Sequence, residues 1–440
     1  MQNNIFIQRP QLLRQVLQYR DTAQIKVLTG FRRSGKSTLL RMVQEQLLND
    51  GVPASHIFVR NFDSFDLPLN YDVQALYLDL QRFFEQNENA NLDGYPSYIF
   101  LDEVQEVEGW ERVVRKLESR THTDVYITGS NSKLLSGELS TYLSGRYTEI
   151  PVYPLSFEEY YPELSRRGLT KEQAFSFYMR FGGMPSLAVL GEKISEHTAR
   201  DILGAIYDSV IIKDVAQRFN LRDTALLEKL SRYILSTTGN LFSTNKITQV
   251  LRAEGVDTSY SAVDNHIRAL KQAFVFYEAE QENLRGKELL RPQRKFYAVD
   301  NGLRNLMHDF ASIDLGAQLE GIVFMELLRR GYQVHVGKVN TEEIDFIADR
   351  GPQRQYIQVT LSMVEESVRQ RELRPLCKLR DAFARIVITL DSYSSGITED
   401  GIRIVNAVDW LLATPSDATG DATVDNPLAT TRGDNLGKFD

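Results

Sequence analysis

The sequence of 440 residues predicts an α/β protein that begins with a parallel β-sheet. Two observations lead to this prediction. Short apolar runs alternate with helical stretches through residues 1–150, which is the order of strands and crossover helices in a parallel sheet. Glycine-rich or polar segments then follow three of these runs, at the edge where parallel sheets bind ligands.

The strands are predicted from β-branched, aromatic and aliphatic residues that follow one another almost without interruption, as in strands buried on both faces. Four runs have this character: "QIKVLTG" (24–30), "HIFVRNF" (56–62), "SYIFLDE" (97–103) and "DVYITGS" (124–130). Two helices, at 36–50 and 109–120, are predicted from apolar residues spaced three or four apart. After Pro151 the pattern becomes mostly helical.

A glycine-rich segment, "GFRRSGKST" (30–38), follows the first strand and leads into a long helix. Its Gly-x-x-x-x-Gly-Lys-Ser spacing fits the Walker A phosphate-binding pattern. In that pattern Lys36 neutralises the β- and γ-phosphates and Ser37 binds Mg²⁺, while backbone N–H groups surround the phosphates. The sequence does not decide whether Arg32 and Arg33 face the phosphates, another subunit or acidic strand ends. The residues assigned to nucleotide binding in this segment are Gly30, Arg33, Ser34, Gly35, Lys36, Ser37 and Thr38.

Two further strand ends carry polar side chains. The run at 97–103 ends in Asp102 and Glu103. We expect Asp102 to hold Mg²⁺ through water and Glu103 to polarise the attacking water, which makes a binding loop a hydrolase site. The run at 124–130 ends in polar residues, of which Ser130 is favoured over Asn131 and Thr128 as a contact of the γ-phosphate or the water. An ordinary strand-to-loop turn is the alternative.

Arg146 follows a helical stretch in "YLSGRY" and has two interpretations. An arginine at this point could stabilise charge that develops on the transferred phosphoryl group. It could equally be a solvated surface residue, and the residues alone favour this second interpretation.

Composition excludes several classes of protein. A net charge of −8 argues against nucleic acid covering the whole surface. No apolar run reaches the ~18–20 residues that span a bilayer, and the N-terminus lacks the pattern of a signal peptide. The single cysteine, Cys377, excludes an internal disulfide framework and fits a reducing compartment. We therefore expect a cytoplasmic protein without membrane contact.

Residues 223–300 contain three helical stretches and a predicted β-ribbon, the order of a winged helix. The third helix, "TSYSAVDNHIRALKQA", stands in the position of a recognition helix. Its residues that could face DNA are Ser261, Asn265, Arg268 and Lys271. This helix also carries Asp264 and is not strongly basic, so packing against the preceding domains is an equal alternative.

The segment 314–412 resembles the PD-(D/E)xK nuclease fold in its order of helices and strands. Glu320 lies on its first predicted helix and Asp345 on a strand, and the next strand carries Gln358 and Thr360 where an active enzyme has an acid and a lysine. An acid and a lysine there would bind Mg²⁺ and orient water. Because both are replaced, we expect a nuclease-like scaffold without activity.

Several motifs occur together in an order that resembles a known family. They are "LTGFRRSGKSTLL", "IFLDEVQEVEGWE", "VYITGSNSKLLSGELSTYLSGRY", "VYPLSFEEY", "FGGMPSLA", "YDSVIIKDV" and "KFYAVDNGLRN". The chain is similar over about residues 5–412 to a prokaryotic family of AAA+-type P-loop ATPases, in which an archaeal-type ATPase domain precedes an associated C-terminal domain of unknown function. This resemblance implies bound ATP and Mg²⁺ at the Walker residues, a sensor group around Thr128–Asn131 and Arg146 as an arginine finger. In AAA+ relatives that finger often serves a neighbouring subunit, so an oligomer is an open alternative.

The domain organisation follows from these segments. We expect an AAA+-type P-loop ATPase domain (1–150), a helical lid or connector (151–222), a winged-helix-like domain (223–300), a degenerate PD-(D/E)xK-like domain (301–412) and an acidic disordered tail (413–440).

The expected function is an Mg²⁺-dependent ATPase whose nucleotide cycle rearranges its C-terminal modules. The alternatives are a nucleotide-gated DNA-binding regulator with little turnover, a nuclease acting through Glu320 and Asp345, and a module that docks a protein partner.

Overall fold

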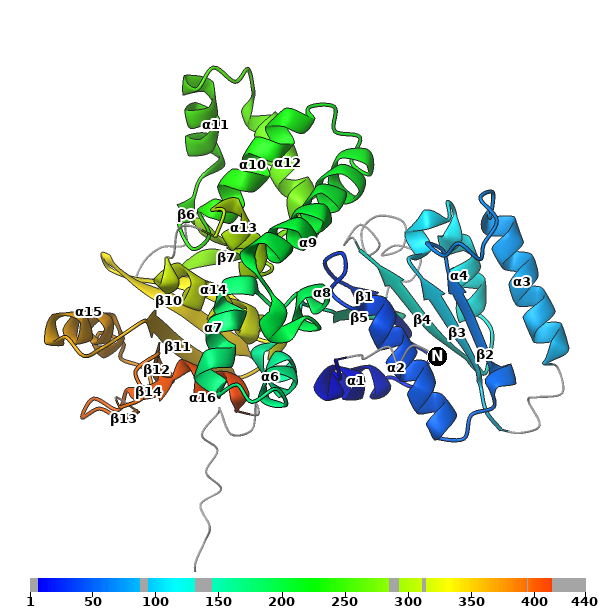
Figure 1. Cartoon of the computed structure of the whole chain (residues 1–440), viewed down its shortest axis with the longest axis horizontal. Helices are drawn as coiled ribbons and strands as arrows, with labels where there is room; N and C mark the ends of the chain where they lie inside the picture. Colours follow the sequence, from blue (N-terminus) through cyan, green and yellow to red (C-terminus); the bar gives the residue numbers. More distant parts are fainter. Residues whose placement is uncertain are drawn as a thin grey trace, which may run out of the picture.

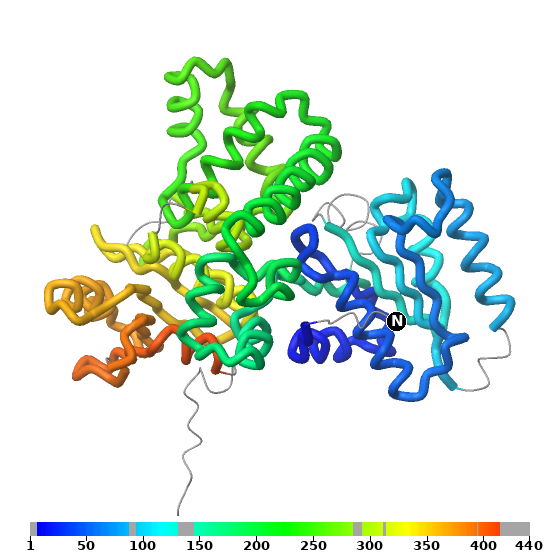
Figure 2. The backbone as a smooth tube through the Cα atoms, in the orientation of Figure 1, coloured from blue at the N-terminus to red at the C-terminus, as the bar shows by residue number. Residues whose placement is uncertain are grey.

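The protein is described as a computed structural model that covers residues 7–87, 94–130, 145–284, 293–310, 314–393 and 395–413. Figure 1 shows two bodies side by side, one coloured blue to cyan and the other green to red. The tube in Figure 2 shows the same division along the chain. Among the described residues, no helix is long and apolar enough to cross a membrane.

The first body contains a five-stranded parallel sheet in the order β2-β3-β4-β1-β5. Its strands are β1 (Ile25–Thr29), β2 (Ile57–Asn61), β3 (Ser97–Asp102), β4 (Thr123–Gly129) and β5 (Tyr147–Pro151). The four predicted strands are confirmed. Strand β5 was not predicted, because its sequence, YTEIP, contains no run of consecutive apolar residues. An edge strand of this kind lacks the continuous apolar run that reveals a central strand.

Helices cover both faces of this sheet. Helices α1 (Pro10–Leu17) and α2 (Lys36–Asn49) pack on one face, where Leu28, Phe100 and Tyr126 are buried. Helices α3 (Val73–Gln86) and α4 (Trp110–Glu118) pack on the other face, against Val27 and Ile99. Coverage of both faces explains why the central strands are mostly apolar.

A mostly helical segment follows the first sheet. It contains α6 (Phe157–Ser165), α7 (Lys171–Phe181), α8 (Pro185–Ala188), α9 (Glu196–Ser209) and a π-helical segment, η6 (Val210–Gln217). Capping boxes at Ser156 and Thr170 begin α6 and α7. The apolar side chains of these helices share one core with residues up to Leu411, so this predicted lid or connector packs as part of the second body.

The next helices are α10 (Thr224–Ser236), α11 (Thr244–Ala253) and α12 (Tyr260–Gln272), with the short strand β6 (Leu241–Phe242) before α11. Strands β7 (Phe276–Asn283) and β8 (Arg294–Ala298) pair antiparallel. The three helices and the β-ribbon predicted for this segment are therefore present. Side chains of Asp223, Ser243 and Ser259 cap the three helices.

The ribbon continues into the rest of the second body. It belongs to one nine-stranded mixed sheet, ordered β13-β14-β12-β11-β10-β9-β7-β8-β6. The strands not yet described are β9 (Gln333–Val339), β10 (Glu342–Arg350), β11 (Gln353–Thr360), β12 (Ala384–Thr389), β13 (Gly396–Ile397) and β14 (Arg403–Asn406). Parallel pairing of β7 with β9 makes the connection. The two segments expected as separate winged-helix-like and nuclease-like domains thus share a sheet.

Four helices complete this body: α13 (Asn301–Met307), α14 (Leu315–Arg329), α15 (Glu366–Cys377) and α16 (Ala407–Leu412). Strands β13 and β14 were not predicted, since they have only two and four residues. Residues 414–440 lie outside the described residues, and the predicted acidic tail is among them.

Candidate nucleotide site

The glycine-rich loop connects β1 to α2 and depends on two glycines. Gly30 has φ +148°, and a Cβ there would lie 2.2 Å from the carbonyl oxygen of Val152. Gly35 is left-handed (φ +104°) and begins α2 without a side-chain cap or an acid in the first turn. The amides at the start of α2 are thus uncapped, which fits an anion at this position.

Lys36 lies inside this loop. Its Nζ donates to the carbonyl oxygens of Gly30 and Phe31, at 3.1 Å each, and lies 3.8 Å from Oε1 of Glu103. Burial lowers the pKa of Lys36, and neighbouring carboxylates only partly oppose this effect. A lysine held mainly by backbone carbonyls can exchange them for phosphate oxygens.

Asp102 ends β3 and meets the start of α2. Its Oδ1 accepts a hydrogen bond of 2.5 Å from the Thr128 hydroxyl. Burial raises the pKa of Asp102, while hydrogen bonds from the hydroxyls of Thr128 and Ser37 lower it. The two residues predicted as Mg²⁺ ligands, Ser37 and Asp102, are therefore neighbours. A buried carboxylate beside a hydroxyl fits a hard cation that prefers oxygen ligands.

Glu103 is held in an uncommon backbone conformation. Its φ is +54°, in the left-handed region that costs a non-glycine residue roughly 1–2 kcal/mol. The Glu103 amide donates to the Thr128 hydroxyl at 2.9 Å, and its Oε2 accepts from the Gln105 side chain. Backbone strain of this kind is concentrated at functional sites. Here it directs the carboxylate towards Lys36.

The polar residues at the end of β4 contact two different groups of side chains. The Thr128 hydroxyl donates to the Asp102 carboxylate and accepts from the Glu103 amide, as described above. Ser130 is fully buried; its hydroxyl accepts from Nη1 of Arg218 at 3.2 Å and lies 3.3 Å from Asp214. Asn131 lies outside the described residues. Thr128 is therefore the residue of this strand end that supports the two acids, and the contact of Ser130 with the γ-phosphate or the water stays a prediction.

The two arginines of the loop have different surroundings. Arg32 pairs with Asp214 of η6, with Nη1 3.3 Å from Oδ1. Arg33 is exposed, with φ +61°. Sequence analysis missed Asp214 and Arg218. The only local signal was an acid and an arginine four residues apart in a helical stretch, which nothing in the sequence connects to a loop about 180 residues earlier.

The loop is also held from the side of α1. Arg9 donates from Nη1 to the Ser34 carbonyl oxygen at 3.2 Å and pairs with Glu159 of α6 at 2.8 Å. The Ser34 hydroxyl is buried without a hydrogen-bond partner among the described residues. Thr38, in the first turn of α2, is half-buried.

Arg146 lies at the other edge of the sheet. Its carbonyl oxygen accepts from the amide of Ile25, the first residue of β1, and its side chain pairs with Glu118 at 2.5 Å. The five residues of β1 span ~16 Å, which separates Arg146 from the loop. Within one chain, Arg146 does not join Lys36 and Glu103. A role towards the site of a neighbouring copy stays a prediction.

In the second body a further lysine pairs with one of the predicted nuclease-like acids and with an acid that was not predicted. Lys295 of β8 pairs with Glu320 at 3.1 Å and with Glu343 at 2.5 Å, and the Tyr297 hydroxyl donates to Glu320 at 2.7 Å. Burial lowers the pKa of Lys295, but Glu320, Asp345 and Glu343 outweigh it and raise the pKa above its usual range. Lys295 and Glu343 were not predicted; they come from β8 and β10, which are separated in the sheet by β7 and β9.

Asp345 and Gln358 lie together in this cluster. Burial and the nearby Glu320 raise the pKa of Asp345 well above its usual range. Its Oδ2 accepts from the Val359 amide at 2.8 Å, and its own amide donates to Gln358 at 3.3 Å. Gln358 donates in turn to Glu372 at 3.0 Å, whereas Thr360 bonds the Ser362 carbonyl.

The four residues predicted to face DNA lie on the exposed side of α12. Ser261, Asn265, Arg268 and Lys271 are all exposed. Each cation already has an acidic partner, however: Arg268 pairs with Asp264 and Lys271 with Glu278, both at 2.9 Å. These pairs reduce the positive potential of the face.

One further group of acids and a histidine has metal-like spacing. In the part of the chain that the structure describes, Glu282, His335 and Asp349 lie within 4.8 Å of one another. Arg354 bonds both acids, at 2.9 Å and 2.7 Å. The arginine supplies the positive charge that a cation would bring.

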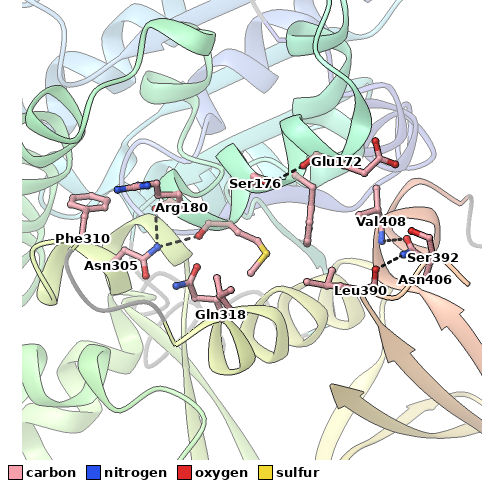
Figure 3. Close-up of a pocket in the computed structure, with 13 residues that line it drawn as sticks. Glu172, Ser176, Arg180, Asn305, Phe310, Gln318, Leu390, Ser392, Asn406 and Val408 are labelled. Atoms are coloured by element: carbon pink, nitrogen blue, oxygen red, sulfur yellow. Dashed lines mark hydrogen bonds between the residues drawn. The ribbon is translucent and has the colours of Figure 1, made fainter. Parts of the chain in front are cut away.

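A pocket of about 320 Å³ lies in the second body, between α7, α13 and the start of α14. Figure 3 shows that Asn305 and Asn406 in its wall are bonded to backbone atoms. Met179 and Phe310 contribute apolar surface. None of the residues singled out in the sequence lines this pocket.

Comparisons with known proteins match two separate segments of the chain. Residues 22–161 match the family described as AAA domain, and residues 172–314 match a domain of unknown function, DUF8612. An uncharacterized protein of Methanocaldococcus jannaschii is 26% identical over 412 residues, 88% of each chain. A Walker-type ATPase structure from Pyrococcus abyssi is 14% identical and covers 69% of this chain and 96% of its own, with a TM-score of 0.49.

A nearer relative extends over almost the whole chain. An uncharacterized protein of Haemophilus influenzae is 38% identical over 409 residues, which are 92% of this chain and 98% of the relative. Together with the AAA match and the parallel sheet, this similarity shows the family. The chain belongs to the family of the Haemophilus influenzae protein, and within it a segment that matches an AAA domain precedes one that matches a domain of unknown function.

Proposed function

We propose that this protein hydrolyses ATP with Mg²⁺ and that the nucleotide cycle changes how the second body contacts the first. One observation carries the proposal. Lys36, Glu103 and the neighbours Asp102 and Ser37 converge on the uncapped start of α2. This set supplies a charge for the phosphates, oxygen ligands for a cation and a base for water.

The residues have separate roles in this proposal. Lys36 binds the β- and γ-phosphates, and the amides at the start of α2 bind phosphate oxygens. Ser37 and Asp102 hold Mg²⁺, which neutralises phosphate charge. Glu103 orients the attacking water and accepts its proton, while Thr128 keeps both acids in place. Arg146 of a neighbouring copy would stabilise the transferred phosphoryl group.

Three variants test this function. Lys36→Ala should abolish nucleotide binding. Glu103→Gln should keep binding but lower turnover by about 10²–10⁴-fold, as expected for loss of a general base. The matched control is Glu108→Gln, because Glu108 is an exposed acid of the same loop. Turnover should be measured by phosphate release and binding by calorimetry, and unchanged turnover of the Glu103 variant would exclude the mechanism.

We also propose that the second body contains a winged-helix-like part (223–300) and a nuclease-like part (301–412) without nuclease activity. Lys295 supports the absence of activity, because its pairs with Glu320 and Glu343 supply internal positive charge where a nuclease would use a metal ion. An Mg²⁺-dependent nicking activity that disappears in Asp345→Ala would contradict this proposal.

Nucleotide-gated DNA binding is the second candidate function. It is favoured by the exposed position of Ser261, Asn265, Arg268 and Lys271 on α12. Duplex binding should be measured by fluorescence anisotropy over a range of salt, with and without ATP. If α12 contacts phosphates, Lys271→Ala should reduce the slope of log K against log salt by about 1. No binding at low salt would leave a protein partner as the role of this face.

A further inference from the structure

The phosphate loop is attached to the second body through two consecutive residues. Phe31 is 1% exposed and belongs to the hydrophobic core that otherwise consists of residues after 154. The next residue, Arg32, pairs with Asp214. A movement of this loop therefore changes contacts in the second body directly, without an intervening segment.

The segment that carries Asp214 has an unusual conformation. Residues Val210–Gln217 continue α9 as a π-helix of eight residues. Most π-helices are single turns, and they are concentrated at functional sites. In this segment the Asp214 side chain is 1% exposed, within reach of Arg32 and of Ser130 at the end of β4. The π-helix thus places the Asp214 carboxylate against both the glycine-rich loop and the end of β4.

Charges of both signs surround Lys36. Asp102, Glu103 and Asp214 favour the charged lysine, and Arg32 opposes it. Arg218 adds a second partner for Asp214, with Nη1 3.3 Å from Oδ1, and also pairs with Glu106 at 2.9 Å. Burial raises the pKa of Asp214, and the two arginines lower it. The two arginines thus stabilise the charged form of Asp214 against its burial.

We propose that Asp214 is a positioning residue that competes with nucleotide phosphate for Arg32, so that nucleotide binding loosens η6 from the phosphate loop. The proposal rests on the proposed function, because it assumes that this loop binds nucleotide. In this proposal, the ion pair of Arg32 with Asp214 connects the two bodies without nucleotide and is weakened when nucleotide binds.

The physical reason is electrostatic competition. A nucleoside triphosphate adds negative charge beside Lys36 and Arg32, and Arg32 cannot neutralise phosphate and Asp214 equally at once. Loss of Arg32 leaves a buried carboxylate with less compensation, which is unfavourable. Asp214 therefore moves with η6 or relies on Arg218. Nucleotide binding and the release of Arg32 from Asp214 are thermodynamically linked. A change that weakens the Arg32–Asp214 ion pair therefore makes nucleotide binding tighter.

The test compares nucleotide affinity in four proteins: wild type, Asp214→Asn, Arg32→Gln and the double variant. The probe is ATP with Mg²⁺, measured by calorimetry. Asp214→Asn should bind about three- to tenfold more tightly, because a competitor for Arg32 is removed. In the Arg32→Gln background the same change should alter affinity by less than about twofold. A residue with only a structural role would not tighten binding through Arg32.

A second measurement reports on η6 itself. Amide hydrogen exchange over residues 205–217 should accelerate when nucleotide binds to wild type. In Arg32→Gln, exchange should be fast already and should not respond to nucleotide. This variant keeps the test valid if Asp214→Asn does not fold. Asp208→Asn, an exposed acid on α9, is the matched control and should leave affinity and exchange unchanged.

The outcomes separate the two proposals. If wild type binds no nucleotide and Lys36→Ala behaves identically, the proposed function fails. If wild type binds nucleotide but Asp214→Asn binds equally or less tightly, the competition is disproved and the proposed function is unaffected. Nucleotide-independent exchange of residues 205–217 in wild type would also overturn the inference.

Discussion

Lys36 and Lys295 are both buried lysines beside acids, in different sheets of the same chain. Lys36 bonds backbone carbonyls and lies 3.8 Å from the one acid with which it pairs among the described residues. Lys295 pairs directly with two acids, at 3.1 Å and 2.5 Å. The pKa of Lys36 is lowered by burial, whereas that of Lys295 is raised because acids outweigh burial.

The opposite pKa shifts of the two lysines show that a buried lysine beside acids can either bind a ligand or stabilise the fold. An ammonium group with a lowered pKa has incomplete compensation within the protein, so it gains from an external anion. An ammonium group with a raised pKa is already neutralised by its neighbours and stabilises the fold. We therefore interpret the Lys36 site as open to a ligand and the Lys295 cluster as internally complete.

The largest expected effect is on stability at Lys295. Lys295→Met should lower the free energy of unfolding by about 3–5 kcal/mol, because Glu320, Asp345 and Glu343 lose their cation. Denaturant unfolding measures the change. The exposed Lys246 of α11 provides the control, and Lys246→Met should change stability by less than about 0.5 kcal/mol. Adding Glu320→Gln to Lys295→Met should restore part of the loss, and no restoration would contradict the interpretation.

Asp300 is a buried carboxyl group whose pKa is set mainly by burial and not by a lysine partner. Burial raises its pKa to about 6, although the amides of Gly183, Gly302 and Leu303 donate to it. Between the ordinary value of 3.8 and 6 the folded state binds more protons, so stability falls as the pH rises through this range. The loss at Asp300 should reach at most about 3 kcal/mol.

Unfolding should therefore be measured from pH 4 to pH 6.5 in wild type and Asp300→Asn. The variant should lose this contribution to the pH dependence, whatever its absolute stability. Asp201→Asn, at an exposed position on α9, should keep the wild-type slope. Identical slopes in Asp300→Asn and wild type would show that the carboxyl group does not titrate in this range.

The smallest stability effect is expected at Lys36. Without nucleotide, Lys36→Met should change the free energy of unfolding by no more than about 1 kcal/mol, since burial already disfavours its charge. With ATP at about 100 times its Kd, wild type should gain about 2.7 kcal/mol and the variant should gain nothing. A loss above about 3 kcal/mol without nucleotide would mean that Lys36, like Lys295, is a structural cation.

Much of the first body was predictable because its signals are local. Strands β1 to β4 were recognised from short apolar runs, and the loop from its two glycines, both of which have φ above zero. Asp102 and Ser37 are neighbours, since parallel strands and the following helix share one edge, and their role as Mg²⁺ ligands stays a prediction. Strands β6, β13 and β14 were missed because they have only two to four residues, and β5 was missed because its sequence lacks an apolar run.

The sequence by itself determined the phosphate loop, the two acids after β3 and the order of most helices and strands, because backbone conformation and strand burial depend on nearby residues. Only the tertiary structure decided that Arg32 meets Asp214, 182 positions away, and that Lys295 meets Glu320. Ion pairs of this kind depend on how helices and strands pack, and the same arginine or lysine would be solvated if its element were rotated. Packing thus determined which charged residues are already paired and which can receive a ligand.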